Sequence, residues 1–178
     1  MFIHLLAGGL VFWLFGMILQ VEVARAHLIL GGVLGLFPDL ISFILSPLLF
    51  SKWAHRHRDN LTHSIFLPAI FLIMAFLFET KILILAGLAM LTHPFLDLFG
   101  IGWGVKLFYP LTQKTYKLFY KGKFLRVWDP KEVDQKVLKA GDNQWIKNIY
   151  FKWNFWGLIE WGSLAVFILL LIFKNFFS

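Results

Sequence analysis

The stretch HRHRDNLTHS, residues 55–64, separates two strongly apolar segments and carries three of the chain's six histidines. The chain has 178 residues, is 59% hydrophobic, contains 21 phenylalanines and has a mean hydropathy of +0.73. This composition is too apolar for a soluble domain of this length. Ionisable groups at membrane depth are costly and mark functional sites by default. We therefore interpret the stretch as the mouth of a site in a membrane protein.

Five apolar segments predict membrane helices, because about 18–20 apolar residues suffice to cross a bilayer. They cover residues 2–21, 26–50, 61–78, 82–102 and 156–173. Glycines and two prolines interrupt the second segment, which we expect to be broken or re-entrant. The predicted fold is an all-α polytopic membrane protein of about five helices. Residues 1–105 would form helices 1–4 with the core of the site, and residues 153–178 the last helix.

Residues 106–152 form a basic, polar insert with signals of its own. The run KLFYKGKFLRVW, residues 117–128, has a central Gly122 between apolar stretches and predicts a short β-hairpin. Asp129 and Pro130 then predict the start of a short helix that stops at Gly141. Its apolar stripe would consist of Val133, Val137 and Leu138. We expect the insert to be a small cap at the membrane surface.

The distribution of Lys and Arg predicts the orientation. If all five segments span, residues 51–60 and the insert share one side, which holds 14 of the 17 basic residues. If the second segment is re-entrant, Arg25 joins that side and the number becomes 15. The positive-inside rule places this side in the cytoplasm of a multi-pass inner-membrane protein. The net charge of +7 then needs no nucleic-acid partner.

Two motifs place histidines beside carboxylates. In THPFLD, His93 and Asp97 are four residues apart, project from one helix face and could bind one ion. The alternative is a hydrogen bond between two buried polar groups. In HRDNLTHS, Thr62 is predicted to cap the third helix, which places His63 in its first turn. His57 could fold back toward His63, and the alternative is a solvated loop attracted to lipid headgroups.

The second segment contains His27 and Asp39, which a straight helix would separate by about 18 Å. They could share a site only if the glycines and Pro38 break the helix. Irregular backbone at this depth would have to line a polar cavity. The alternative is a kinked helix with Asp39 as a cap and His27 at the interface. His4, alone near the start of the first helix, is interpreted as structural.

Together these residues form a ligand set of nitrogen and oxygen donors without cysteine. Such a set suits Zn²⁺, with Mn²⁺ or Fe as alternatives, and could hold one ion or two. Asp59 is a further ligand or a general base. The candidate metal ligands are His27, Asp39, His57, His63, His93 and Asp97.

At these residues the sequence resembles the LexA-binding, inner-membrane-associated hydrolase family, also described as membrane-bound metal-dependent hydrolases. The resemblance covers roughly residues 24–110. The residues that carry it are His27, Pro38-Asp39, His57-Arg58, Thr62-His63-Ser64, His93 and Asp97, followed by Gly100, Gly102, Gly104 and Pro110. The family often has a second acid where this chain has Ile41. The departure implies a single ion here, or recruitment of Asp59.

The resemblance and the residues together predict a metal-dependent hydrolase at the cytoplasmic face of the membrane. Whichever of Asp39, Asp97 and Asp59 is not a ligand would be the general base. Arg58 and Arg56 would bind a phosphate, and the location suggests a phosphate ester of a membrane lipid as substrate. One alternative is a transporter for a metal ion or proton that uses intramembrane His and Asp. Another is a non-catalytic membrane module that binds a regulator or nucleic acid through the insert.

Overall fold

The computed structural model describes residues 1–45, 54–140 and 144–174. These residues form seven α-helices, two short 3-10 turns (η2 and η3) and one two-stranded antiparallel sheet. In chain order the elements are α1 (Phe2–Ile18), α2 (Arg25–Leu45), η2 (Ala54–Arg58), η3 (Leu61–His63), α3 (Phe66–Leu77), α4 (Lys81–Phe99), β1 (Thr115–Tyr120), β2 (Lys123–Trp128), α5 (Pro130–Ala140), α6 (Trp145–Tyr150) and α7 (Phe155–Phe173).

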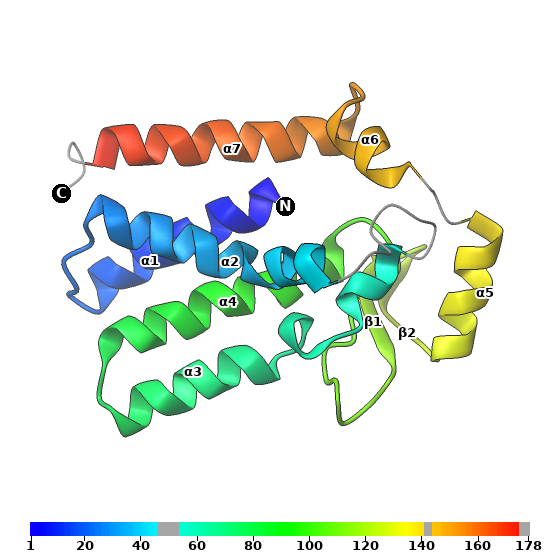
Figure 1. Ribbon diagram of the computed structural model, residues 1–178, viewed down its shortest axis with the longest axis horizontal. Helices are drawn as coiled ribbons and strands as arrows, with labels where there is room; N and C mark the ends of the chain where they lie inside the picture. Colours follow the sequence, from blue (N-terminus) through cyan, green and yellow to red (C-terminus); the bar gives the residue numbers. More distant parts are fainter. Residues whose placement is uncertain (46–53, 141–143, 175–178) are drawn as a thin grey trace.

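The first four helices and α7 form an elongated bundle in which consecutive helices alternate in direction (Figure 1). Helices α1, α2 and α4 pack on one another, α3 packs on α4, and α7 packs on α1. Strands β1 and β2 and helix α5, together called the cap, lie at one end of this bundle (Figure 1). We call that end the cap end and the opposite one the far end. Helix α1 begins at the cap end, whereas α2 and α4 finish there.

Three helices are long and apolar enough to cross a membrane, within the part of the chain that the structure describes. They are α2, α4 and α7. Helices α1 and α3 are apolar but shorter, with 17 and 12 residues. The predicted third segment is shorter than expected because α3 begins only at Phe66, after η3. The mostly helical prediction is confirmed, and the small sheet is the hairpin predicted within the insert.

Helix α2 runs without a break from Arg25 to Leu45 and keeps Pro38 inside it. The predicted break is therefore wrong for this range, while Pro47 lies outside the described residues. The glycines serve packing instead. A Cβ atom on Gly35 would lie 2.4 Å from the carbonyl oxygen of His4, and one on Gly8 would lie 2.1 Å from that of Gly31. Small residues thus let the backbones of α1 and α2 touch, as is common between membrane helices.

The cap confirms the local predictions made for the insert. The strands pair around Lys121 and Gly122, and Gly122 has a φ of 78°, a conformation that glycine adopts at low cost. Helix α5 begins at Pro130 as expected, and Gly141 lies outside the described residues. Val133 and Val137 are buried against Trp128 in the cap's own core. Leu138 is 59% exposed and does not join that stripe.

Candidate metal centre

Six buried side chains meet at the cap end of the bundle in two groups of three. One group is Asp39, His57 and His63, and the other is His4, His93 and Asp97. Within each group the candidate ligand atoms all lie within 4.8 Å of one another. None of these six residues is more than 7% exposed. The two groups come from five elements that are distant in sequence, so packing of the helices assembles them.

Chain direction explains why these residues meet. Helix α1 starts at the cap end and brings His4 in its first turn. Helices α2 and α4 end there and supply Asp39, His93 and Asp97 late in their length. Turns η2 and η3 cross that end and add His57 and His63. The structure thereby brings together five of the six predicted ligands, from four separate elements.

Asp39 links the two groups. Its Oδ1 atom lies 3.5 Å from Nε2 of His63, 3.6 Å from Nε2 of His93 and 3.7 Å from Nε2 of His57. These distances are too long for hydrogen bonds. Two ligands of one tetrahedral zinc ion, each bonded at about 2.0–2.1 Å, stand roughly 3.3 Å apart. The convergence of three imidazoles on one carboxylate oxygen therefore fits a shared metal ion better than a hydrogen-bond network.

Hydrogen bonds on the other side of two rings leave a nitrogen lone pair for the centre. Nδ1 of His93 lies 2.8 Å from the carbonyl oxygen of Gly35, which can only accept, so Nδ1 carries the proton. Nδ1 of His63 lies 3.2 Å from Oδ1 of Asn60. Nε2 of each ring is buried and has no hydrogen-bond partner in the described residues. Orientation of a metal-binding imidazole by a bond at its other nitrogen is the usual pattern in metal sites.

Asn60 organises the loop, and the sequence analysis did not single it out. Its Oδ1 atom accepts the Thr62 N–H and its amide nitrogen donates to the carbonyl of His57 at 2.7 Å. The same amide nitrogen donates to Ser42 of α2 at 3.1 Å. Asn60 caps the turn η3 that presents His63. The prediction that Thr62 caps the third helix is wrong, because Thr62 lies within η3 and α3 begins only at Phe66. The preference of asparagine for N-cap positions was the available signal.

Arg58 borders the second group. Its guanidinium lies 3.1 Å from Oδ1 of Asp97 and donates to the carbonyl oxygen of Ile101 at 2.9 Å. Arg58 Nε is buried with no hydrogen-bond partner among the described residues. The second oxygen of Asp97 is likewise unpartnered and lies 3.7 Å from Nε2 of His93. Arg58 thus holds one oxygen of Asp97 and leaves the other to face the centre.

His4 joins the second group and is therefore not isolated, although its position in the sequence suggested that it was. Its ring stacks on that of His93 with centroids 3.9 Å apart, and its Nε2 atom lies 3.8 Å from Oδ1 of Asp97. Its Nδ1 atom is buried and unpartnered within the described part of the chain. The available signal was spacing, since His4 is four residues before Gly8 and so shares the face that packs on α2.

His27 lies at the far end and outside both groups. Because α2 is continuous, His27 in its first turn stays about 18 Å from Asp39 along the helix axis. Nδ1 of His27 accepts the N–H of Ala24 at 3.0 Å, a local cap of the helix start. The predicted pairing of His27 with Asp39 is therefore wrong.

Two further predicted residues lie beside the centre without facing it. Asp59 pairs with Lys106 at 3.0 Å and with Arg56 at 3.5 Å. Arg56 also pairs with Asp134 of α5 and so links the loop to the cap. Asp59 is absent from both ligand groups, which does not favour its recruitment as a substitute ligand.

His63 and Lys117, at the edge of the centre and outside the apolar helices, have displaced pKa values. Burial lowers the pKa of His63, which favours the neutral imidazole that metals bind. Burial, with a smaller contribution from the positive charge of Arg58, lowers the pKa of Lys117 to about 8. Lys117 donates a hydrogen bond to the carbonyl of Gly100, just after α4. Lys117 and Arg58 are therefore two cations beside Asp97 at the edge of the centre.

Comparison with protein families identifies the chain's relatives. A family model described as the YdjM inner membrane protein matches residues 1–176. The chain belongs to the YdjM inner membrane protein family. The match spans the bundle, the centre and the cap of this YdjM-family protein, and it agrees with the apolar helices in indicating a membrane protein. Searches of curated proteins and of solved structures gave no match.

Proposed function

We propose that this protein is a metal-dependent hydrolase at the cytoplasmic face of the inner membrane. The observation that carries the proposal is the pair of buried, unpartnered Nε2 atoms on His63 and His93, both facing Oδ1 of Asp39. Burial of such polar atoms is costly unless something binds them. A divalent cation, zinc foremost, satisfies both nitrogens and neutralises the carboxylate.

The geometry supports two ions more than one. Each group supplies three donors, which is the number that a catalytic zinc site takes from its protein. His4 is the third donor of the second group, for which the sequence had indicated only His93 and Asp97. Asp39 and His93 stand at the junction between the groups, 3.6 Å apart. Neighbouring ions about 3.5–4 Å apart are typical of two-metal hydrolytic sites.

A bound ion would supply hydroxide near neutral pH by lowering the pKa of water. Side chains of the protein would transfer the proton and bind the substrate. Whichever of Asp39 and Asp97 does not bind an ion would accept a proton. The guanidinium of Arg58, fixed by Asp97 and the Ile101 carbonyl, would orient an anionic phosphoryl group and offset its charge.

The location of the centre supports a substrate from the membrane. The six side chains come from the cap-end parts of α1, α2 and α4 and from the turns η2 and η3, which cross that end. A transporter would need ligands near the bilayer midplane with access from both sides. A centre at one end, beside an arginine, suits hydrolysis of a phosphate ester of a lipid. Five membrane helices, with α1 and α3 inserted beside the three longer ones, complete the proposed topology.

The decisive experiment is elemental analysis of the detergent-purified protein. The parent should carry one or two equivalents of Zn, or of Mn or Fe, and a His63→Ala/His93→Ala variant should carry almost none. His27→Ala, at the far end, is the matched control and should keep the metal.

Phosphate-ester hydrolysis, assayed with phosphatidic acid in mixed micelles, should stop with a chelator and return with zinc. A metal-free parent, or a double variant that keeps its metal, would overturn the centre. Metal without hydrolysis but with ion uptake into vesicles would favour the transporter.

A further inference from the structure

Four phenylalanines form a continuous row on the outside of the molecule. Phe95 and Phe99 of α4 stand 5.1 Å apart between ring centroids, Phe99 and Phe119 stand 5.7 Å apart, and Phe119 and Phe124 stand 5.2 Å apart. We call these four residues the aromatic ladder. Every ring is exposed, from 39% for Phe99 to 68% for Phe124. The ladder joins an apolar helix to the hairpin.

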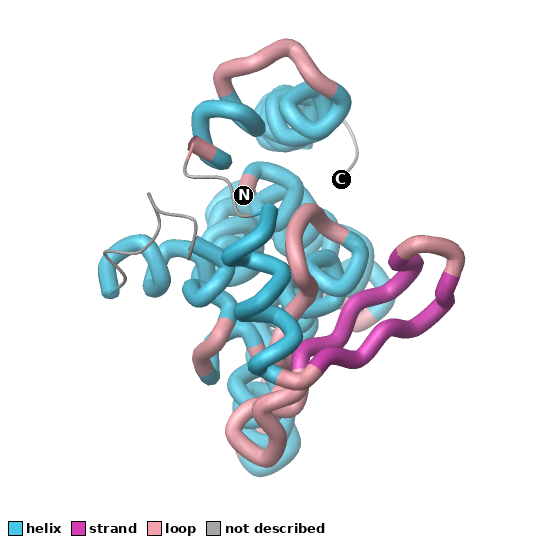
Figure 2. Tube along the Cα trace, turned by 90° about the vertical axis from the view of Figure 1, so that its right-hand side faces the viewer, coloured by secondary structure: helices cyan, strands magenta, loops and turns pink. Residues whose placement is uncertain are grey.

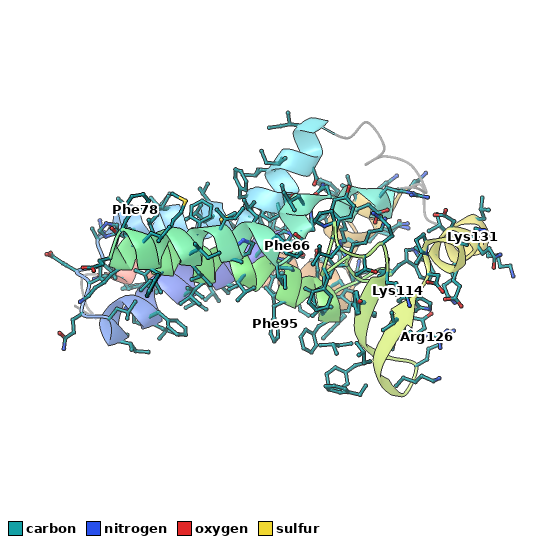
Figure 3. The ribbon with its side chains drawn as sticks, turned by 90° about the horizontal axis from the view of Figure 1, so that it is seen from below. Phe66, Phe78, Phe95, Lys114, Arg126 and Lys131 are labelled. Atoms are coloured by element: carbon teal, nitrogen blue, oxygen red, sulfur yellow. The ribbon has the colours of Figure 1, made fainter. Side chains whose placement is uncertain are left out.

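The direction of the hairpin sets where the ladder leads. Figure 2 looks along the bundle and shows the two strands projecting sideways beyond the helices. In Figure 3 the hairpin extends toward the same side of the molecule as Phe95. Since α4 is long and apolar enough to span a membrane, a sideways hairpin at its end runs roughly along the membrane surface. The ladder therefore continues the lipid-facing surface of α4.

Only half of the hairpin is supported by the protein. Near its base, Thr115 and Trp128 are buried, and Trp128 packs on Val133 and Val137 of α5. Near its tip, Phe119 contacts Phe124 and Phe99 of α4, and Leu125 is 49% exposed. A projecting two-stranded ribbon is marginally stable in water. Its exposed apolar tip needs a covering surface.

The charge at the tip indicates which surface that is. Lys121 and Lys123 flank Gly122 at the turn, and both are exposed. Apolar rings beside lysines are the combination found in segments that lie in the membrane interface. Each lysine near an anionic headgroup adds to the attraction. Lipid thus complements both the rings and the charges of this tip.

We propose that the tip of the hairpin, residues 118–125, is a membrane-surface anchor that inserts the outer rings of the aromatic ladder among anionic lipid headgroups. The anchor would hold the cap at a fixed height above the bilayer. Because α5 packs on the hairpin base and Asp134 pairs with Arg56, that height would carry over to the loop of the candidate metal centre. The proposal does not depend on the presence of a metal.

The chain has no cysteine, so a single nitroxide label can report depth in the full-length protein. Phe124→Cys places the label on the ladder, and Leu138→Cys places it on an exposed position of α5. In vesicles of phosphatidylcholine with phosphatidylglycerol, the label at 124 should be accessible to oxygen and shielded from a water-soluble nickel complex. The label at 138 should show the opposite. Equal nickel accessibility at both positions would overturn the anchor. Spin–spin broadening at 124 that grows with protein density would also overturn it, by assigning the ladder to a second copy of the chain.

The lysines are tested with the same label. Replacement of phosphatidylglycerol by phosphatidylcholine should raise the nickel accessibility at 124 in the parent. Lys121→Gln/Lys123→Gln should raise it already in the anionic vesicles and remove most of the lipid dependence. Lys131→Gln/Lys139→Gln on α5 removes the same charge elsewhere and should behave as the parent does. An equal response of the two double variants would overturn the role of the tip lysines.

Discussion

The first turns of α1 and α2 form a natural comparison, because each carries a histidine as the third residue of its helix. His4 is 5% exposed and stacks on His93 in the centre. His27 is half-buried and, within the described residues, its ring hydrogen-bonds to the start of its own helix. The two helices run in opposite directions, so their first turns lie at opposite ends of the bundle. Topology, and not residue type, decides which histidine can reach a carboxylate.

The same contrast holds for the two ends of the bundle. At the far end, exposed cations bond to carbonyls at helix ends, as Lys81 does with Leu19 and Arg25 with Ile172. Such contacts satisfy the last carbonyl groups of a helix and interact favourably with the helix dipole. At the cap end, buried imidazoles and carboxylates face one another at distances beyond hydrogen-bond length. Capping explains the far end, whereas the cap end calls for a ligand.

The largest expected difference is in zinc affinity, between the variants His4→Ala and His27→Ala. His4→Ala removes a donor from the second group, and His27→Ala removes none. Loss of a partner outside the ligand shell already weakens metal affinity by about 10–100-fold. We therefore expect His4→Ala to weaken binding of one zinc ion by about 100-fold or more, with His27→Ala unchanged. Titration against a chromophoric zinc chelator measures both. Equal affinities in the two variants would remove His4 from the centre.

Features that depend on neighbouring residues could be predicted from the sequence, whereas features that depend on contacts between distant helices could not. The hairpin and α5 depend on neighbouring residues, and KLFYKGKFLRVW with Asp129-Pro130 indicated both. Spacing alone placed His93 beside Asp97. His4 joins them from the far end of the sequence, through contacts of α1 with α2 and α4 that no local pattern encodes.

The glycines of α2 show how one pattern predicts two structures. In isolation, Gly31, Gly32 and Gly35 beside Pro38 are typical of a broken helix. In the fold they form the surface on which α1 rests, and Pro38 stays within a continuous helix. The packing of α1 on these glycines stabilises the continuous helix, and a local pattern does not reveal a partner helix. For the same reason Asp39 was expected near His27, and His4 on the partner helix was not expected at the site.

The glycine contact provides the next test, with Gly162 of α7 as control. A methyl group at Gly35 would meet the backbone of His4 and Gly8, which cannot move aside cheaply, whereas one at Gly162 meets nothing within 4 Å. Gly35→Ala should lower the free energy of unfolding by about 2 kcal/mol, the usual cost of overpacking. It should also weaken zinc binding, because Gly35 orients His93. Gly162→Ala should do neither. Thermal unfolding in detergent with zinc titration compares them, and an unchanged Gly35→Ala would show that α1 and α2 are not in close contact.

The smallest expected effect concerns Lys117, at the edge of the cap end, against Lys114, which is exposed nearby. Burial holds the pKa of Lys117 at about 8, below its ordinary value of 10.5. Between these values the unfolded chain binds more protons than the folded one, so stability rises with pH. The penalty of a buried charge is fully present below pH 8, and its relief should add about 1 kcal/mol between pH 8 and 9. Lys117→Met should remove this rise and Lys114→Met should retain it, as measured by unfolding at a series of pH values. A rise that persists in Lys117→Met would assign the pH dependence to another group and leave Lys117 as an ordinary cap of α4.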